Sequence, residues 1–497
     1  MPNKDLITVV DNPKVPLTEL WTADTSQASL QNPFFKPSKG SRSAAESVGS
    51  DKPYLKINSV PITEIDLLIL DETGQIPKVK AIFTDKTGAL SGSNYPKNDP
   101  IMSVYIKTQN PKFKAIRCDF LITSIKTNQD PIINAANIDS GATFIMSGEL
   151  FIPKIYNNVS KGYRNMNSKE ALRTIAEDND LGFACNEFTP NDKMTWLNTN
   201  RSSLKFMEHV SKHSYMNDDS FFTAFVDKYY HLTFVNIAEQ LNPGHDVVMT
   251  YENTADASQF EASQANKEKL DDGRYDVLNL VGLTNRDSHK GKPEYIINYS
   301  LMGDTGRILK NKGFKKKVFY YDHKLDNKFT SFYVNPVTIK GYENNVSNRG
   351  LSPDNDNLRE STIKKWMNID YGNAHAEWNA SILINDHNNS ELNKVKLKVE
   401  TAGINFQVSR GNGVPILLYN TAQANLSKNS QRTDANLDGG ADTALDTDTL
   451  VPDGILSGRY YVSGVKYKYD KLNTSFPYIT EFQLARVNWL GEKNIVE

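Results

Sequence analysis

Two distant segments of this chain carry the same pattern of residue types. CDFLITSIKTNQD at 118–130 and GRYYVSGVKYKYD at 458–470 align without a gap. The positions that agree in kind are Phe120 with Tyr460, Ile122 with Val462, Thr123 with Ser463, Ile125 with Val465, Lys126 with Lys466 and Asp130 with Asp470. After a polar gap, each segment leads into a second strand-like run, from Thr143 in one copy and from Tyr478 in the other. The pattern predicts an internal repeat of a β-rich unit.

The second copy of this repeat also predicts how its strand is shaped. Val465, Tyr467 and Tyr469 alternate with lysines, which is the period of a strand with one buried face. Before Ser463 the apolar residues occupy the other set of alternate positions, so the alternation changes phase at Ser463 and Gly464. A glycine at such a point favours a β-bulge that bends the strand. A small, sharply curved barrel needs a bend of this kind.

The bulk composition excludes several classes of protein. The net charge is −2, from 57 basic and 59 acidic residues, so no global field attracts nucleic acid or a membrane surface. No stretch approaches the ~18 apolar residues of a membrane span, and the first residues lack the apolar centre of a signal peptide. We therefore expect folding in a reducing cytoplasm. Cys118 and Cys185 are expected to be small buried residues rather than a disulfide or a zinc site.

Changes in composition along the 497 residues predict several regions. Hydrophobic residues make up 38% and the mean hydropathy is −0.53, which favours modest cores and long polar loops. The predicted regions are a flexible N-terminal arm at 1–54, a first small β-barrel at 55–165, an α+β module at 166–275, a second similar barrel from 276–340 and 391–497, and an insertion at 341–390.

The α+β module has the clearest local signals. A helix is predicted to begin after Asn167 or Ser168, with Glu170 placed for a capping box. A second helix is predicted near Ser202. FFTAFVDKYYHLTFVN alternates as a hairpin that turns at 227–228.

Candidate chemical sites are few, and each has a simpler structural reading. His209 and His213 stand four residues apart on the second predicted helix, a spacing that lets two histidines bind one metal ion. The residues between them do not include the glutamate of a zinc protease helix. The same spacing also fits an exposed helix face. The acidic run at 434–449 offers oxygens to calcium without EF-hand spacing, and it also fits a solvated loop. The basic run at 310–317 fits a phosphate backbone, an acidic partner or a solvated turn. We assign no catalytic, cofactor-binding or metal-binding residue and expect no enzyme activity.

The order of elements resembles a known family. A capped helix, a Gly-Phe turn, MTWLNTNRSSLKFMEHVSKHSY and FFTAFVDKYYHLTFVN follow one another within 166–236. Together with the ending LSGRYYVSGVKYKYD…YITEFQLARVNW, this order resembles the central hub proteins of contractile phage tail baseplates. Late-control hub proteins of other tails and the hub part of the type VI secretion spike are the wider relatives. The arm before Leu55, the Asn-rich insertion and the loop at 421–457 have no counterpart that we assign.

The resemblance implies a β-rich α+β fold with two tube-type barrels and a structural role without turnover. It implies a homotrimer whose six barrels form a ring between the sixfold tail tube and the threefold spike, with DNA passing through a polar lumen without specific binding. The implied partners are a tail spike protein, a tail tube or tube-initiator protein and baseplate wedge proteins, in a virion tail assembled in the host cytoplasm.

Three other readings stay open. Another tail component, such as a distal tail or tube protein, uses the same barrel but usually in one copy. A baseplate cell-wall hydrolase requires a carboxylate or metal site that the sequence does not display. A carbohydrate-binding receptor protein would use the many aromatic residues, which alternating strands also account for.

Overall fold

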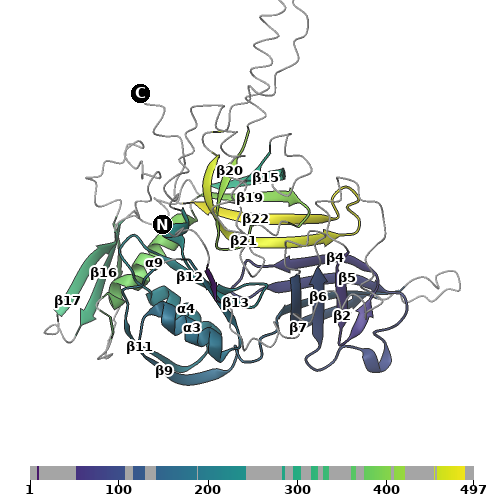
Figure 1. Cartoon of the computed structure of the whole chain (residues 1–497), viewed down its shortest axis with the longest axis horizontal. Coiled ribbons are helices and arrows are strands. Elements are labelled where there is room, and N and C mark those ends of the chain that lie inside the picture. The colour runs from purple at the N-terminus through teal and green to yellow at the C-terminus, as the bar shows by residue number, and fades with distance from the viewer. Residues whose placement is uncertain are drawn as a thin grey trace, which may run out of the picture.

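The computed structural model contains a large antiparallel sheet with a smaller α+β module beside it (Figure 1). The residues that the structure describes are 8–10, 52–106, 116–128, 141–186, 188–241, 283–285, 295–303, 315–322, 328–334, 360–364, 374–375, 377–393, 395–404, 408–419, 453 and 456–486. The N-terminal arm apart from 8–10 and 52–54, the acidic run 434–449 and most of the loop 421–457 lie outside these residues.

The large sheet has 13 strands, in the order β15-β19-β22-β21-β4-β5-β8-β7-β6-β2-β3, with β20 and β14 attached beside β21. Its strands from the first half of the chain are β2 (Tyr54–Ile57), β3 (Val60–Ile62), β4 (Ile65–Asp71), β5 (Lys78–Asp85), β6 (Ile101–Ile106), β7 (Ile116–Asn128) and β8 (Ala142–Leu150). Those from the second half are β14 (Leu283–Thr284), β15 (Ile296–Gly303), β19 (Val395–Ala402), β20 (Gly413–Leu417), β21 (Gly458–Asp470) and β22 (Tyr478–Arg486).

Five strands of each half pair in the same order. We define repeat 1 as β4-β5-β8-β7-β6 and repeat 2 as β15-β19-β22-β21-β20. In both repeats, all four pairings along this path are antiparallel. The sequence repeat, which covers β7 and β21 with the strands that follow them, is therefore confirmed as a repeat of strand pairing.

The repeats also share their irregularities. The pairing of β7 with β8 shifts register between Ile122 and Ser124, and that of β21 with β22 shifts between Val462 and Gly464. The predicted bulge is thus present, and it lies at aligned positions in both copies. The Thr123 hydroxyl donates to the Ser147 carbonyl at 3.2 Å, and the Ser463 hydroxyl donates to the Gln483 carbonyl at 2.9 Å. A second shift of register is also shared: it lies at the start of β4 in its pairing with β5, and at the start of β15 in its pairing with β19.

The repeats differ where a barrel would close. In repeat 1, β6 continues antiparallel into the β2–β3 hairpin. In repeat 2, β20 instead pairs in parallel with the two-residue strand β14, and Thr284 forms a single bridge to Tyr295 just before β15. Within the described residues neither repeat has a continuous ladder all the way round. The structure therefore shows a β-rich fold with a large antiparallel sheet, and the two barrels stay a prediction.

The α+β module follows repeat 1 and matches its local predictions. Helix α3 (Ser168–Asp178) has Asn167 as N-cap with a capping box to Glu170, and α4 (Ser203–His213) begins after Ser202. The predicted hairpin is β12 (Phe222–Val226) with β13 (His231–Asn236). The remaining module elements are β9 (Asn158–Met166), β10 (Gly182–Cys185), β11 (Met194–Ser202) and α5 (Ile237–Leu241), with the N-terminal β1 (Thr8–Val10) paired to β10.

Three further strands form a sheet of their own. β16 (Lys315–Asp322) pairs with β17 (Lys328–Val334) and with β18 (Glu360–Lys364), and α9 (Trp378–Leu392) packs against β16 and β17. We placed 315–334 in the second barrel from their alternation, but they do not extend the large sheet. Periodicity identifies a strand without naming its partner. The domain boundaries themselves stay predictions.

Candidate functional site: the seam, the edges and the polar face of the duplicated sheet

The two repeats meet in one seam, where β21 of repeat 2 pairs antiparallel with β4 of repeat 1 (Figure 1). We call this pairing the inner seam. Its five register pairs run from Lys466 opposite Asp71 to Asp470 opposite Leu67. The seam uses only the second half of β21, because the first half pairs with β20. The Glu72 amide extends it by donating to the Val465 carbonyl at 2.8 Å.

The core side of the inner seam is closely packed. Leu70 is 0% exposed and its register partner Tyr467 is 2% exposed. Tyr469 on the same face is 6% exposed and lies 5.0 Å from the Tyr478 ring between centroids. The predicted alternation of β21 is confirmed, since Val465, Tyr467 and Tyr469 face the core.

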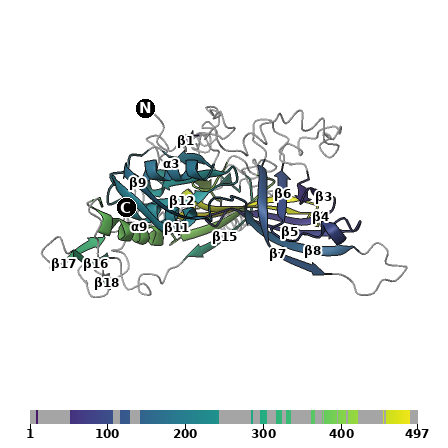
Figure 2. The same ribbon diagram turned by 90° about the horizontal axis from the view of Figure 1, so that it is seen from below.

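The strands equivalent to the two seam strands are the first strand of repeat 2 and the fourth strand of repeat 1. β15 occupies the position of β4, and the second half of β7, residues 123–128, occupies that of the second half of β21. Among the described residues, 298–302 pair only with β19 and 123–128 pair only with β8. We call these two stretches the outer edges. Figure 2 shows β7 and β8 side by side at the repeat 1 end of the sheet.

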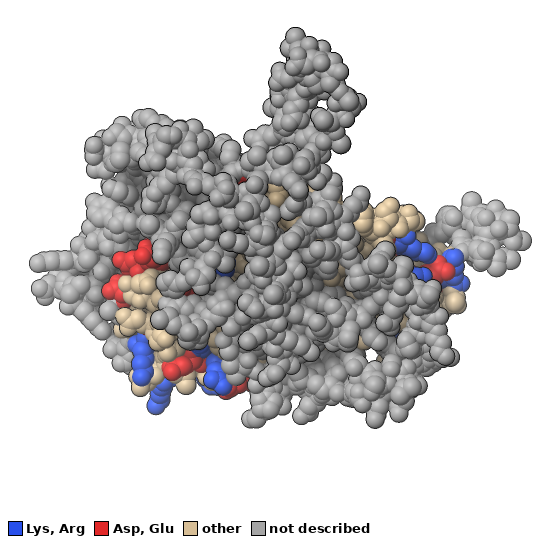
Figure 3. All heavy atoms as spheres, turned by 45° about the horizontal axis from the view of Figure 1, so that its top comes forward, with Lys and Arg blue, Asp and Glu red and all other residues tan. Residues whose placement is uncertain are grey.

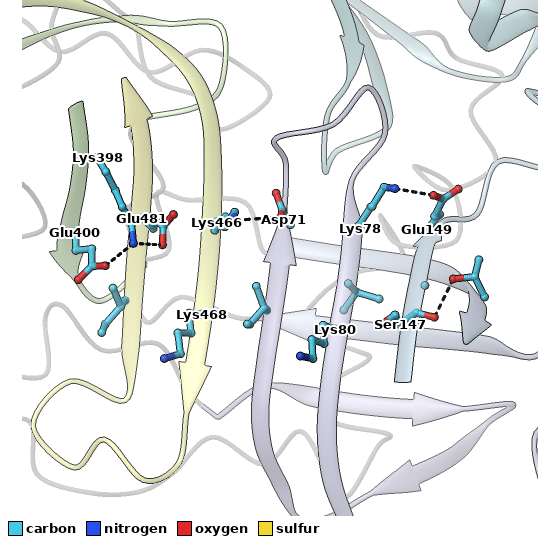
Figure 4. Close-up of a pocket in the computed structure, with 15 residues that line it drawn as sticks. Asp71, Lys78, Lys80, Ser147, Glu149, Lys398, Glu400, Lys466, Lys468 and Glu481 are labelled. Carbon is cyan, nitrogen blue, oxygen red and sulfur yellow. Dashed lines mark hydrogen bonds and ion pairs between the residues drawn. The ribbon is translucent and has the colours of Figure 1, made fainter. Parts of the chain in front are cut away.

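The other face of the sheet carries a row of charges, one for each strand. The residues in register are Glu400, Glu481, Lys466, Asp71, Lys78 and Glu149, on β19, β22, β21, β4, β5 and β8 respectively. We call them the charge row. It crosses both repeats and the inner seam without a break (Figure 4).

Ion pairs compensate the charge row along its length. Lys466 Nζ lies 3.5 Å from an Asp71 oxygen, and Lys78 Nζ lies 2.9 Å from a Glu149 oxygen. The two adjacent glutamates at the other end share Lys398, which lies 3.1 Å from Glu400 and 2.9 Å from Glu481. The hydrogen bond to Glu481 is the main reason that the pKa of Lys398 is raised.

A groove of about 600 Å³ lies over this face. Its charged lining residues are Lys78, Lys80, Lys398, Lys466, Lys468, Asp71, Glu149, Glu400 and Glu481. Lys468 and Lys80 stand in a second row, on either side of Ile69 (Figure 4). With five lysines and four carboxylates, the groove is close to charge balance.

A buried ion pair fixes the module to the inner seam. Lys228 Nζ lies 3.2 Å from a Glu72 oxygen, with the two side chains 3% and 2% exposed. The other Glu72 oxygen accepts from the Lys228 amide at 2.7 Å. The Lys228 ammonium also lies 5.0 Å from the centre of the Tyr467 ring. A charge this deeply buried is stable only with such partners, so this junction constrains how module and seam sit together.

The sequence-predicted histidine pair lies in an aromatic cluster. The rings of His209 and His213 are 4.7 Å apart, and His213 stacks on Trp378 of α9 at 3.8 Å. His375 Nε2 lies 3.1 Å from the His213 carbonyl oxygen. Desolvation is the main cause that lowers the pKa of His209 and of His375 to about 4. The arrangement packs α9 onto α4, which is a structural use of these residues.

Other candidates are placed as follows. In the part of the chain that the structure describes, no three His, Cys, Asp or Glu side chains gather as metal ligands, and no helix is long and apolar enough to span a bilayer. Cys118 and Cys185 are both buried and free, as predicted. The basic run is described only at 315–317, in β16. In Figure 3, the described residues show basic and acidic side chains close together.

Comparison with known proteins finds likenesses among solved structures only. No protein-family model and no curated protein matches the sequence. Among solved structures, a 43 kDa tail protein of prophage MuSo2 from Shewanella oneidensis is 8% identical, with a TM-score of 0.49 over 88% of this chain and 98% of that one. A tail protein from Neisseria meningitidis is also 8% identical, with a TM-score of 0.45 over 88% and 97%.

A third similar structure is an Escherichia coli component of the type VI secretion system, described as structurally similar to the T4 tail proteins gp27 and gp5. It is 9% identical, with a TM-score of 0.38 over 87% of this chain and 77% of that one. The first two of these structures are tail proteins and the third is a secretion-system component.

The charge row and the junction were not found from the sequence. One sequence signal for the charge row was available, namely lysines that alternate with apolar residues in two strands with equivalent pairing. These are Lys78-Val79-Lys80-Ala81 in β5 and Lys396-Leu397-Lys398-Val399 in β19. No sequence signal connects Glu72 with Lys228.

Proposed function

We propose that this chain is the central hub of a phage tail baseplate, acting as a homotrimer whose six repeats form a ring. The observation that carries the proposal is the inner seam: two equivalent five-strand units stand side by side, with β21 of repeat 2 paired to β4 of repeat 1. Units joined in this head-to-tail way either close into a ring or continue as a filament. Three chains with two units each then present six similar surfaces.

In this role the hub adapts a sixfold tail tube to a threefold spike and lets the genome pass. Where the two repeats are alike, the ring offers six similar contacts. Where they differ, as in β2–β3 against β14, it offers only three of each kind. A duplicated chain therefore supports both symmetries. The binding energy comes from large obligate interfaces, typically above ~2,000 Å², and no catalytic turnover is part of the proposal.

The charge row is proposed to face the passage. Its opposite face packs the core of each repeat, as Leu70 and Tyr467 do. A wall with lysines and carboxylates in neighbouring positions presents little net field, so a moving polyanion is neither held nor strongly repelled. A wall of lysines alone would bind the phosphate backbone and retain it.

The test is the mass and shape of the purified full-length chain. Native mass spectrometry and negative-stain electron microscopy are expected to give three times 55.9 kDa and rings with a central opening. A chain that stays monomeric up to tens of micromolar, alone and with the spike protein from the same tail, contradicts the hub. Lysis of cell-wall material by the pure protein would instead favour a hydrolase.

A further inference from the structure

Repeat 1 carries a group of apolar side chains on the face of the sheet that bears the charge row. Leu67, Ile82 and Ile145 lie in register on β4, β5 and β8, and each is partly exposed. Ile69 lies next to Leu67 on the same face and is also partly exposed. The buried core of the repeat lies on the opposite face of these strands. We call the four side chains the aliphatic patch.

Two lysines without partners border the aliphatic patch. Lys80 of β5 and Lys126 of β7 are register neighbours of patch residues, and both are exposed. Among the described residues neither lysine forms an ion pair. On the side of the inner seam, by contrast, Lys468 and Asp470 compensate one another at 3.2 Å. The patch therefore combines an apolar surface with two cations that no carboxylate of the described chain neutralises.

Repeat 2 has a different chemistry at the same positions. The equivalent pairs are Leu67 with Asn298, Ile69 with Ser300, Ile82 with Glu400 and Ile145 with Glu481. The equivalent of Lys80 is Lys398, which both glutamates share at 3.1 and 2.9 Å. The equivalent of Lys126 is Lys466, which pairs with Asp71. Repeat 2 thus neutralises these lysines within the sheet, whereas repeat 1 has isoleucines in place of the glutamates.

We propose that the aliphatic patch binds a partner protein that contributes an acidic amphipathic helix. Neighbouring strands are about 5 Å apart, so the row from Leu67 to Ile145 spans roughly 10 Å. On a helix, positions i, i+4 and i+7 lie on one side over roughly the same 10 Å. The helix lies across β4, β5 and β8 with its apolar side on the patch. Its carboxylates pair with Lys80 and Lys126, in the role that Glu400, Glu481 and Asp71 have in repeat 2.

The inference goes beyond the proposed hub and does not depend on the ring. One chain carries the aliphatic patch on one repeat only. In a homotrimeric ring the patch occurs on alternate units, so its partner distinguishes the two repeats on a face where their strand pairing is the same.

Fluorescence anisotropy with the full-length chain tests the surface. The probe is a labelled peptide of about five helical turns, with leucines at i, i+4, i+7 and i+11 and glutamates beside them. A control peptide has the same composition in an order without an apolar side. We expect the amphipathic probe to bind at least tenfold more tightly than the control. Equal binding of the two peptides, or no binding of either, overturns the inference.

Exchanging residues between the repeats places the probe on the patch. I82E/I145E gives repeat 1 the glutamates of repeat 2 and is expected to weaken binding of the probe at least tenfold. E400I/E481I makes the reverse change and is expected to let the chain bind a second probe. Circular dichroism checks that both variants are folded. Unchanged affinity in I82E/I145E overturns the inference.

The two lysines are tested without touching the apolar side chains. K80Q/K126Q changes exposed positions only, so it is expected to fold as the natural chain does. We expect it to weaken binding of the probe at least threefold and to make binding less sensitive to salt, because screening acts on the ion pairs. The same affinity and salt dependence as the natural chain contradict the role of the lysines and overturn the acidic partner.

Two further measurements separate the partner from other occupants. If deletion of the acidic run 434–449 raises the affinity for the probe at least tenfold, this chain itself supplies the occupant and the partner protein is overturned. If binding of the probe falls as the chain associates with itself, a second copy covers the patch and the partner is again overturned. We expect neither change. A chain that is monomeric throughout but binds the probe at the patch overturns the hub and supports this inference.

Discussion

The inner seam and the outer edges use equivalent strands in two different situations. In the inner seam β4 and β21 are paired, Leu70 and Tyr467 are buried, and an ion pair joins Lys466 to Asp71. At the outer edges the same positions hold Leu301, 40% exposed, and the exposed Thr127. Burial at these positions therefore follows from having a neighbouring strand. The residues at the inner seam suit a permanent partner, because they combine a packed core face with an ion pair on the other face.

The largest expected effect breaks the anchor that only the inner seam has. Lys228→Met leaves the Glu72 carboxylate buried without its cation, and loss of one partner of a buried pair typically costs about 3–5 kcal/mol. Chemical denaturation followed by circular dichroism measures this loss. The double variant E72L/K228M is expected to recover much of it because no buried charge remains. If the single variant loses less than the double, the ion pair does not anchor the module.

A matched pair of leucines compares the two regions directly. Leu70→Ala is expected to lower the free energy of unfolding by about 2–5 kcal/mol, because it opens a cavity in a packed core. Leu301→Ala is expected to change it by no more than about 0.5 kcal/mol when measured on dilute monomer, since its site is partly solvated. Equal losses would mean that Leu301 already belongs to a core within one chain.

Acid is expected to destabilise the histidine cluster between α4 and α9 and to leave the inner seam stable. Because the pKa values of His209 and His375 are lowered to about 4, their contribution to stability is present above pH 6.5 and is lost as the pH falls from 6.5 towards 4. The shift in each histidine's pKa corresponds to an upper bound of roughly 3 kcal/mol in the free energy of unfolding.

Hydrogen exchange measures this acid effect along the chain. Protection of α9 is expected to fall between pH 7 and pH 4.5, while that of β21 and β4 stays high. His375→Gln removes one titrating group and is expected to reduce the change. Equal loss of protection in α9 and in the inner seam would show that the histidine cluster is not the acid-sensitive part.

The smallest expected loss of stability comes from removing the side-chain hydrogen bond at each of the two bulges. Ser463→Ala removes a hydrogen bond at a partly buried site and is expected to cost about 0.5–1.5 kcal/mol. Thr123→Ala removes the equivalent bond at an exposed site, where water replaces it, and is expected to cost less than about 0.5 kcal/mol. Thermal unfolding resolves the order of the two. A larger loss at Thr123 would reverse the comparison between the repeats.

Local features were predicted well because their causes are local. The capping box at Asn167 and Glu170 lies within one helical turn, and the bulge at Ser463 shows as a change of phase along a single strand. The partners of β16 and β17 were not predicted: they form a sheet of their own with β18 and do not extend the large sheet. Their alternation is that of a strand with two different faces, but it does not specify which strand lies beside them.

The sequence by itself determined that a β-rich unit occurs twice and that a capped α+β module lies between the copies. Alternation, capping and turn chemistry act over a few residues, and a repeat is visible wherever these patterns recur. Only the tertiary structure decided that the copies share one sheet through β21 and β4, that six charges align across it, and that Glu72 meets Lys228. These contacts join residues that are far apart in the chain, and they depend on which faces remain to be buried after each unit has folded.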